Sequence, residues 1–335
     1  MSRTGTNQPL LQVENLRVEI PGRRGTLVAV DDISFAIGEG EVLGVVGESG
    51  AGKSLTGAAV IGLLEPPCRI AGGQILFDSR RIDNLPYEKL RRIRGRHIGM
   101  VFQDPLTSLN PLYTVGRQLT ETILTHSDLS EKGARKRALE LLQEVGIPAA
   151  ERRIDQYPHE FSGGMRQRVV IALALCASPR LIIADEPTTA LDVSIQAQII
   201  TLLKRLCRDH GAAVMLVTHD MGVIAETADR VAVMYAGRIV EIGPVADVVL
   251  RARHPYTEGL MGSIPLVGHD VDRLTQIDGA MPRLNAIPAG CAFNPRCPKA
   301  FERCRQARPE LETVEATEAA CWLYEEAPER SGTDG

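Results

Sequence analysis

The feature that most constrains the fold is the segment EVLGVVGESGAGKSLTGAAVIGLLEPP near the start of the chain. Val42–Val46 form a short apolar run that ends at Gly47. An alanine-rich stretch begins at Lys53 and stops before Pro66. Because glycines separate a short apolar run from a longer stretch of helix-forming residues, the pattern predicts a buried strand, a glycine loop and a helix.

The loop matches the complete pattern G-x-x-x-x-G-K-S, in the strand-to-helix context that this pattern requires. Its glycines let backbone N–H groups point inward, where the start of a helix adds positive potential for a phosphate. Lys53 would reach the β- and γ-phosphates of a nucleotide, and Ser54 would ligate Mg²⁺. The predicted nucleotide-binding residues here are Gly47, Glu48, Ser49, Gly50, Ala51, Gly52, Lys53 and Ser54.

The length and composition set the class of protein. The 335 residues exceed the usual single-domain length of about 100 to 200, so we expect one large domain and a smaller one. An apolar fraction of 44% is typical of globular proteins, and a formal charge of -4 gives no basic field for nucleic acid. The opening residues lack a signal-peptide pattern, and no run reaches the roughly 18 apolar residues of a membrane span. We therefore expect a cytoplasmic protein with no nucleic-acid partner.

A second apolar run, Leu181–Ala184, ends in Asp185 and Glu186. We expect this strand inside a parallel sheet beside the P-loop strand, which would place Asp185 near the metal ion and Glu186 just past it. One carboxylate could then hold Mg²⁺ while the next acts on water. Taken without the P-loop, two acids after a strand could also be turn residues.

A third segment, EFSGGMRQRVVIALALCASPR, places Ser162, Gly163 and Gly164 directly before an apolar helix that ends ahead of Pro179. A serine N-cap followed by exposed N–H groups makes a second anion-binding helix start. A chain with one P-loop seldom needs two such sites for a single nucleotide.

The order of the motifs, P-loop, FSGGM, LIIADE, TALD and VTHD, resembles that of ATP-binding cassette (ABC) ATPases over about Leu10 to Gly243. The resemblance implies an α/β P-loop NTPase core with an inserted helical subdomain and an antiparallel β subdomain, plus a small cysteine-containing C-terminal extension. In this family the FSGGM signature of one subunit closes over ATP held by another, so a dimer is implied. The implied domains are residues 1–245, with the helical subdomain at about 104–160, and residues 246–335.

The resemblance carries over single positions. Gln103, after GMVF, resembles the glutamine that contacts Mg²⁺ and the attacking water, and Asp192 resembles the aspartate that bridges the two subunits. His219 resembles the histidine that holds the γ-phosphate, although a lone histidine after a strand is more often structural. Ile20 stands where the family usually has an aromatic side chain to stack on adenine. Glu186 is the expected general base for ATP hydrolysis.

Between Gln103 and Ser162 the pattern changes from strands to helices. The segment SEKGARKRALELLQEVGIP spaces apolar residues for one helix face, places lysine and arginine on the other, and breaks at Gly146 and Pro148. The apolar positions of this expected helix are Ala138, Leu141, Leu142 and Val145.

Two functional classes compete, the motor subunit of a membrane transporter and a soluble cassette ATPase that acts on DNA or ribosomes. Only 109 positions separate Lys53 from Ser162, too few for the long coiled coil of chromosome-type members, and a single motif set argues against the tandem ribosomal type. A nucleotide-binding module without turnover conflicts with the presence of Glu186 and His219. Transport driven by ATP hydrolysis is therefore favoured.

The segments QDPLTSLNPLYTVGRQL, RHPYTEGLMGSIP and GCAFNPRCP resemble the ATPases of dipeptide and oligopeptide importers. Importers of nickel and other small solutes share this pattern, so the cargo stays open. The resemblance implies a peripheral position at the cytoplasmic face of the cell membrane. Implied partners are a second ABC ATPase, commonly an unlike relative, two membrane permease subunits and an extracytoplasmic solute-binding protein.

Four of the seven cysteines gather near the end of the chain, at Cys291, Cys297, Cys304 and Cys321. Clustered cysteines in a reducing compartment indicate metal binding rather than disulfides. Four thiolates suit zinc or an iron–sulfur cluster, and spacings of five, six and sixteen residues lack the C-x-x-C pairs of common zinc sites. We therefore expect a 4Fe-4S cluster, with Zn²⁺ as the alternative; related importer ATPases have this cysteine set.

The alternative is that all four are unligated thiols. We expect that state for the three remaining cysteines, Cys68, Cys176 and Cys207. A metal centre would supply crosslinks to a segment that is poor in apolar residues. Nothing in the sequence places this centre beside the ATP, so we expect its role to be structural or regulatory.

Overall fold

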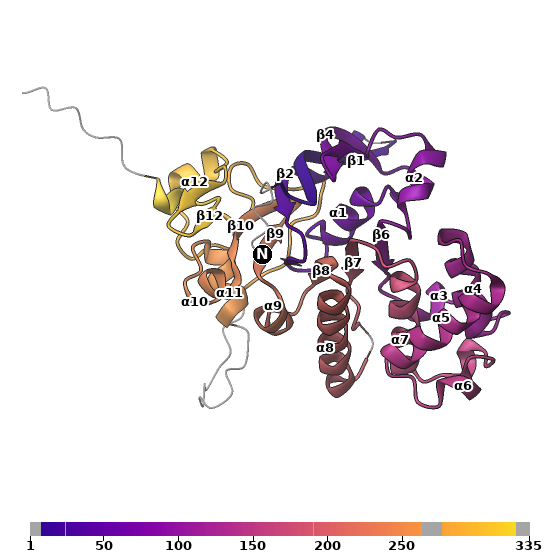
Figure 1. Cartoon of the computed structure of the whole chain (residues 1–335). Helices are drawn as coiled ribbons and strands as arrows, with labels where there is room; N and C mark the ends of the chain where they lie inside the picture. Colours follow the sequence, from indigo (N-terminus) through magenta and orange to yellow (C-terminus); the bar gives the residue numbers. More distant parts are fainter. Residues whose placement is uncertain (1–7, 24, 190, 263–276, 326–335) are drawn as a thin grey trace, which may run out of the picture.

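The computed structural model describes residues 8–23, 25–189, 191–262 and 277–325. They form an eight-stranded sheet and a four-stranded sheet, with helices packed around them (Figure 1). The ends of the two expected domains, residues 1–7 and 326–335, lie outside the described residues. The mixed α/β architecture with a separate antiparallel sheet is the one that the resemblance to ABC ATPases implies.

The larger sheet contains the strands that lead to the nucleotide motifs, in the order β11-β12-β10-β9-β3-β8-β7-β6. Its strands are β3 (Val42–Val46), β6 (Ile98–Val101), β7 (Leu181–Asp185), β8 (Ala213–Thr218), β9 (Arg230–Tyr235), β10 (Arg238–Pro244), β11 (Glu312–Val314) and β12 (Thr317–Ala319). The five strands from β9 to β6 pair in parallel and are almost wholly buried. Such strands are covered on both faces, which explains their continuous apolar runs.

The expected position of the Asp185 strand beside the P-loop strand is wrong. β8 lies between β3 and β7: its Val214 pairs with Val42 on one side and with Ile182 on the other. The order of parallel strands is set by long crossover connections, which a local apolar pattern does not encode. Asp185 still lies near the P-loop, because its partner is on the helix that follows the loop.

The smaller sheet is antiparallel, in the order β2-β1-β4-β5. Its strands are β1 (Leu11–Gly22), β2 (Gly25–Ile37), β4 (Arg69–Phe77) and β5 (Arg80–Arg81). Ile20 lies near the end of β1, where it pairs with Leu27 of β2.

Helices follow most of these strands. They are α1 (Lys53–Val60), α2 (Tyr87–Ile93), α3 (Pro105–Ser108), α4 (Val115–His126), α5 (Glu131–Glu144), α6 (Ala150–Arg153), α7 (Gly163–Leu175), α8 (Val193–His210), α9 (Met221–Thr227), α10 (Val245–Leu250), α11 (Pro255–Gly262) and α12 (Glu302–Gln306), with 3₁₀ turns η1 (Pro158–Glu160) and η2 (Trp322–Tyr324). The helix predicted from Lys53 stops earlier than Pro66, because Gly62 adopts a φ of +68°. The Gly62 N–H then bonds to Ala59 O at 3.0 Å and the Leu63 N–H to Ala58 O at 2.7 Å, a Schellman cap.

The helical region from α3 to α6 forms one side of the molecule, at the right in Figure 1. The helix predicted around residues 131–145 is α5, and its apolar face is buried as expected. Ala138, Leu141 and Leu142 are fully inaccessible to solvent.

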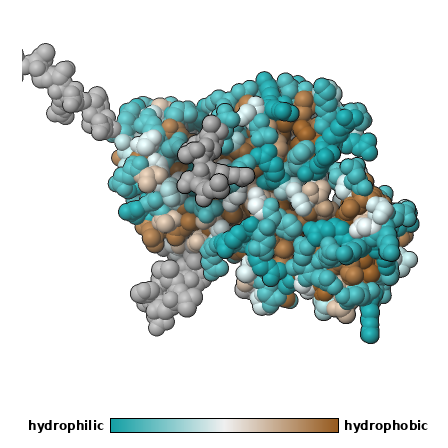
Figure 2. Space-filling model, in the orientation of Figure 1, coloured by the Kyte–Doolittle hydropathy of each residue, from teal (hydrophilic) through white to brown (hydrophobic). Residues whose placement is uncertain are grey.

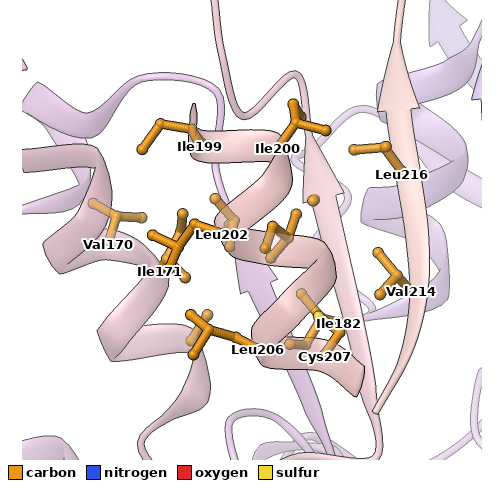
Figure 3. Close-up of a cluster of buried hydrophobic side chains, with 14 of the residues drawn as sticks. Val170, Ile171, Ile182, Ile199, Ile200, Leu202, Leu206, Cys207, Val214 and Leu216 are labelled. Carbon is orange, nitrogen blue, oxygen red and sulfur yellow. The ribbon is translucent and has the colours of Figure 1, made fainter. Parts of the chain in front are cut away.

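Packing between helices and the parallel strands fixes the strand ends that carry the motifs. Figure 3 shows Ile171 of α7, Leu206 of α8 and Ile182 of β7 meeting in one apolar cluster. Cys207 lies in the same cluster, and burial raises the pKa of its thiol to about 12. Cys207 and Cys176 are thus ordinary buried thiols, while Cys68 is only half-buried.

The C-terminal extension is continuous with the main sheet. β12 pairs antiparallel with β10, where Glu241 lies opposite Ala319 and Ile242 opposite Glu318. β11 pairs with the other side of β12 and forms the edge of the sheet. The face seen in Figure 2 is mostly hydrophilic, with small separate hydrophobic patches. Within the described ranges, none of the helices has the length and apolar character needed to span a membrane.

Candidate nucleotide-binding site

The P-loop connects the end of β3 at Val46 to the start of α1 at Lys53. Its glycines are required by close backbone approaches. A Cβ atom on Gly47 would lie 2.2 Å from the carbonyl oxygen of Met234, and one on Gly52 would lie 3.0 Å from that of Ala29. Gly47 therefore passes β9 at a distance that only glycine allows, and Gly52 combines a tight approach to β2 with a φ of +101°, which favours glycine.

The side chain of Lys53 crosses the inside of the P-loop and contacts its backbone. Its side chain is 4% exposed, and Nζ donates to the carbonyl oxygens of Gly47 at 2.8 Å and Glu48 at 3.1 Å. Burial lowers the pKa of Lys53, while the carboxylates of Glu186, Asp185 and Glu48 act in the opposite direction. The ammonium is thus held beside backbone groups at the position where the motif predicts phosphates.

Ser54 and Asp185 form the oxygen pair expected for a cation. Ser54 Oγ donates to Asp185 Oδ1 at 2.9 Å. Burial raises the pKa of Asp185, while the bond from Ser54 lowers it. A divalent cation would favour the ionised carboxylate, and hydroxyl and carboxylate oxygens are ligands that Mg²⁺ accepts.

Glu186 lies at the centre of a second group of polar side chains. Gln103 Nε2 donates to Glu186 Oε2 at 3.1 Å, and His219 Nδ1 lies 3.4 Å from Glu186 Oε1. Thr189 Oγ1 also donates to Glu186 Oε2, at 2.8 Å. Glu186 has a φ of +44°, a strained value that persists only where the surroundings impose it. The structure thus joins residues that follow β6, β7 and β8, and adds Thr189, which the sequence analysis did not identify.

Most of these groups line one cavity of about 870 Å³, although Asp185 and Thr189 are not among its lining residues. One part of its lining is the P-loop with Leu55, Gln103, Glu186 and His219. The remaining lining residues are Ala29, Leu260, Met281, Pro282, Arg283 and Leu284. Ile20 is not among the lining residues, so the structure does not bring it together with the P-loop.

The second predicted anion site lies apart from this cavity. Ser162 caps α7 by accepting a hydrogen bond from the Met165 N–H at 3.4 Å, as the sequence predicts. Gly163 and Gly164 approach the start of α8, where an added Cβ would lie 3.5 Å from Leu191 and 2.9 Å from Ile195. Asp192 is exposed immediately before α8. Within one chain, Ser162, Gly163, Gly164 and Asp192 therefore do not line the P-loop cavity.

The four C-terminal cysteines surround one small cavity, together with His254. Burial raises the pKa of Cys291 and Cys321 to about 11, and the neighbouring thiols act in the same direction. His254 is buried, which lowers its pKa to about 3, and its Nδ1 accepts a hydrogen bond from the Tyr256 N–H at 3.1 Å. Among the described residues, no group of three or more histidine, cysteine or acidic side chains is placed so that it could hold a metal ion.

The cysteine segment is directly linked to the P-loop, contrary to the expectation that nothing places it beside the nucleotide. Arg296, next to Cys297, is 8% exposed and its Nη1 lies 3.1 Å from Glu48 Oε1. The same nitrogen donates to the Tyr235 hydroxyl at 3.3 Å, and the Glu48 N–H donates to the Tyr256 hydroxyl at 2.8 Å. No local pattern predicts this contact, because 248 positions separate Arg296 from Glu48.

Comparison with known proteins decides the family. Residues 30–189 match the family model described as ABC transporter, and residues 240–304 match that described as oligopeptide/dipeptide transporter, C-terminal region. The oligopeptide transport ATP-binding protein AppD of Bacillus subtilis is 46% identical over 95% of this chain and 97% of its own length. The chain belongs to the ABC transporter ATPase family. This assignment confirms the resemblance on which the domain and motif expectations rest.

Other ABC ATPases give the same result. The dipeptide transport ATP-binding protein DppD of Bacillus subtilis is 47% identical, over 98% of each chain. The oligopeptide transport ATP-binding protein OppD of Salmonella typhimurium is 48% identical over 92% of this chain and 93% of its own. Among solved structures, the dimeric post-hydrolysis ATP-binding cassette MJ0796 bound to ADP and Pi is similar with a TM-score of 0.63 at 30% identity. It covers 70% of this chain and 98% of its own.

Proposed function

We propose that this chain is the ATP-hydrolysing subunit of a membrane importer for dipeptides or oligopeptides. The observation that carries this proposal is the single cavity that joins the P-loop to Glu186, Gln103 and His219. The names of the relatives support the peptide assignment, because they are oligopeptide and dipeptide transport ATP-binding proteins. We also propose the division into a nucleotide-binding domain, residues 1–245, and an extension, residues 246–335.

The polar residues in and beside the cavity have proposed roles in hydrolysis. Lys53 and the P-loop N–H groups bind the triphosphate and orient it. Ser54, Asp185 and Gln103 carry oxygen ligands for Mg²⁺, which neutralises charge on the phosphates when bound. Glu186 accepts the proton of the attacking water, and His219 holds the γ-phosphate.

Two such chains, or one chain and an unlike relative, would form the active unit. Ser162 and Asp192 lie outside the P-loop cavity of their own chain, so their proposed nucleotide is the one held by the neighbouring subunit. The separate placement of the two anion sites supports this arrangement. The similar ATP-binding cassette MJ0796 is dimeric in two solved structures.

The surface around Gln103 supports a membrane partner. Phe102, Leu106 and Leu112 are 44%, 62% and 78% exposed, and all three lie within nine positions of Gln103 along the chain. Large apolar side chains exposed so close together in the sequence support a contact surface. We propose that one of two permease subunits binds here, that the chain lies peripherally at the cytoplasmic face, and that a solute-binding protein selects the cargo.

Purifying the tagged chain from its native membrane tests this proposal. We expect permease subunits and a second ABC ATPase to co-purify. Leu106→Asp should reduce permease recovery severalfold without weakening ATP binding, because it places a charge in the apolar contact. Leu250→Asp is the matched control, since Leu250 is 80% exposed on α10 in the extension. Recovery of ribosomes or DNA-repair factors in place of permeases would contradict the transport assignment.

We further propose that Cys291, Cys297, Cys304 and Cys321 hold one metal centre, a 4Fe-4S cluster, with Zn²⁺ as the alternative. All four line one small cavity, which supports the choice of ligands, although as placed they do not form a group that could hold a metal ion. Burial raises the pKa of Cys291 and Cys321, so the thiolates needed for binding are favoured there only with a bound cation. A cluster accepts ligands from loops that are farther apart than those of a single ion.

Anaerobically purified protein is expected to be brown and to contain iron and sulfide. Cys297→Ser should bleach it, because a ligand is lost, whereas Cys68→Ser should keep the colour, because Cys68 does not line the cavity. Metal analysis and the visible absorption spectrum provide the measurement. Colourless protein with one zinc per chain would contradict the iron–sulfur assignment but support the metal site. Protein without metal would contradict both.

A further inference from the structure

The C-terminal extension lines part of the nucleotide cavity that the P-loop leaves uncovered. The P-loop lies where the phosphates would bind, at the start of α1. Met281, Arg283 and Leu284 line the same cavity, although they are more than 220 positions from the loop. ATP has a charged end and a flat, largely apolar end, so a lining that lies beyond the phosphates meets the nucleoside.

The chemistry of this segment suits a base and ribose. Met281 and Leu284 are half-buried and apolar, and Met281 packs against both hydrophobic clusters of the core. Arg283 is exposed, and its side chain has no hydrogen bond or ion pair with any other described residue. A guanidinium plane stacks on nucleobases, and thioether and aliphatic groups pack on them.

Arg296 holds the backbone that immediately precedes Met281. Its Nε donates to the carbonyl oxygen of Asp278 at 2.8 Å, and its Nη2 donates to that of Gly279 at 3.3 Å. The same guanidinium pairs with Glu48 of the P-loop. One buried arginine therefore fixes the segment and the phosphate loop relative to each other.

We propose that Met281, Arg283 and Leu284 form the wall that binds the nucleoside part of ATP, and that Arg296 is the residue that positions it. This proposal rests on the proposed ATPase function. The extension would then make the contact with the nucleoside that the resemblance assigns to the position of Ile20. Ile20 itself, on β1, does not line the cavity.

The test compares binding of Mg·ATP with binding of Mg·tripolyphosphate, which has the phosphates but no nucleoside, in the full chain. Arg283→Ala combined with Leu284→Ala should raise the Kd for ATP about 5- to 50-fold, in the range of a lost base-stacking contact. The Kd for tripolyphosphate should change less than about twofold. Arg305→Ala is the control, because Arg305 is an exposed arginine on α12 outside the cavity, and it should bind ATP as the unmodified chain does.

Arg296→Ala should lower the preference for ATP over tripolyphosphate, and Arg296→Lys should restore part of it by keeping the charge beside Glu48. Unchanged ATP binding in the double variant would overturn the wall and leave the ATPase function intact, provided that Lys53→Ala still loses both ligands. Equal loss of both ligands in the double variant would also overturn the wall. An unmodified chain that binds neither ligand would overturn the wall and the ATPase function together.

Discussion

Replacing Glu186 with glutamine should leave Mg·ATP bound and reduce its hydrolysis by roughly 10²- to 10⁴-fold, the usual contribution of a positioned general base. Glutamine has nearly the same shape, so it can keep the contacts with Gln103 and Thr189. It cannot accept the proton of the attacking water. Phosphate release from the assembled transporter and nucleotide binding to the same preparation provide the two measurements.

Glu39→Gln is the matched control, because Glu39 is exposed and pairs with Arg180, and neither residue lines the cavity. It should retain full turnover. The opposite pattern, with turnover kept in Glu186→Gln and lost in His219→Ala, would move the base to His219. The distance of 3.4 Å between His219 Nδ1 and Glu186 Oε1 makes this the specific competing assignment.

The sequence predicted those parts of the fold whose causes are local. The strand Val42–Val46 has the predicted bounds, and α7 begins after the Ser162 cap, because apolar periodicity and capping residues act within a few positions. The sequence also allowed a prediction that Gln103, Glu186 and His219 lie close together. All three follow parallel strands, whose carboxyl ends share one edge of the sheet.

The features that were missed depend on contacts between distant segments. Crossover connections set the position of β8 between β3 and β7. Asp185 therefore contacts Ser54 on α1, although its strand does not pair with β3. The contact between Arg296 and Glu48 joins two domains of the expected division. The sequence around Arg296 does not indicate which acidic residue it will contact, so the ion pair with Glu48 is seen only in the folded chain.

Replacing Lys53 with alanine should weaken ATP binding by about 10- to 100-fold. Hydrogen bonds to charged groups contribute about 1.5 to 3 kcal/mol each, and each 1.4 kcal/mol is a factor of ten in Kd. The loss should not come from unfolding. Burial lowers the pKa of Lys53, which means that its charged form is costly to bury without a phosphate beside it. Removing the side chain relieves that cost, so the melting temperature of the nucleotide-free chain should change little.

Lys204→Ala separates the effect of the site from that of any lost lysine. Lys204 Nζ also donates to a backbone carbonyl, that of Glu226 at 2.7 Å, but it lies on α8 outside the cavity. Titration with ATP and thermal unfolding of both variants give four values. The assignment requires weak binding with an unchanged melting temperature in Lys53→Ala alone. If Lys53→Ala binds ATP like the unmodified chain, the P-loop is not the phosphate site; if both variants lose binding equally, Lys53 has no special part in it.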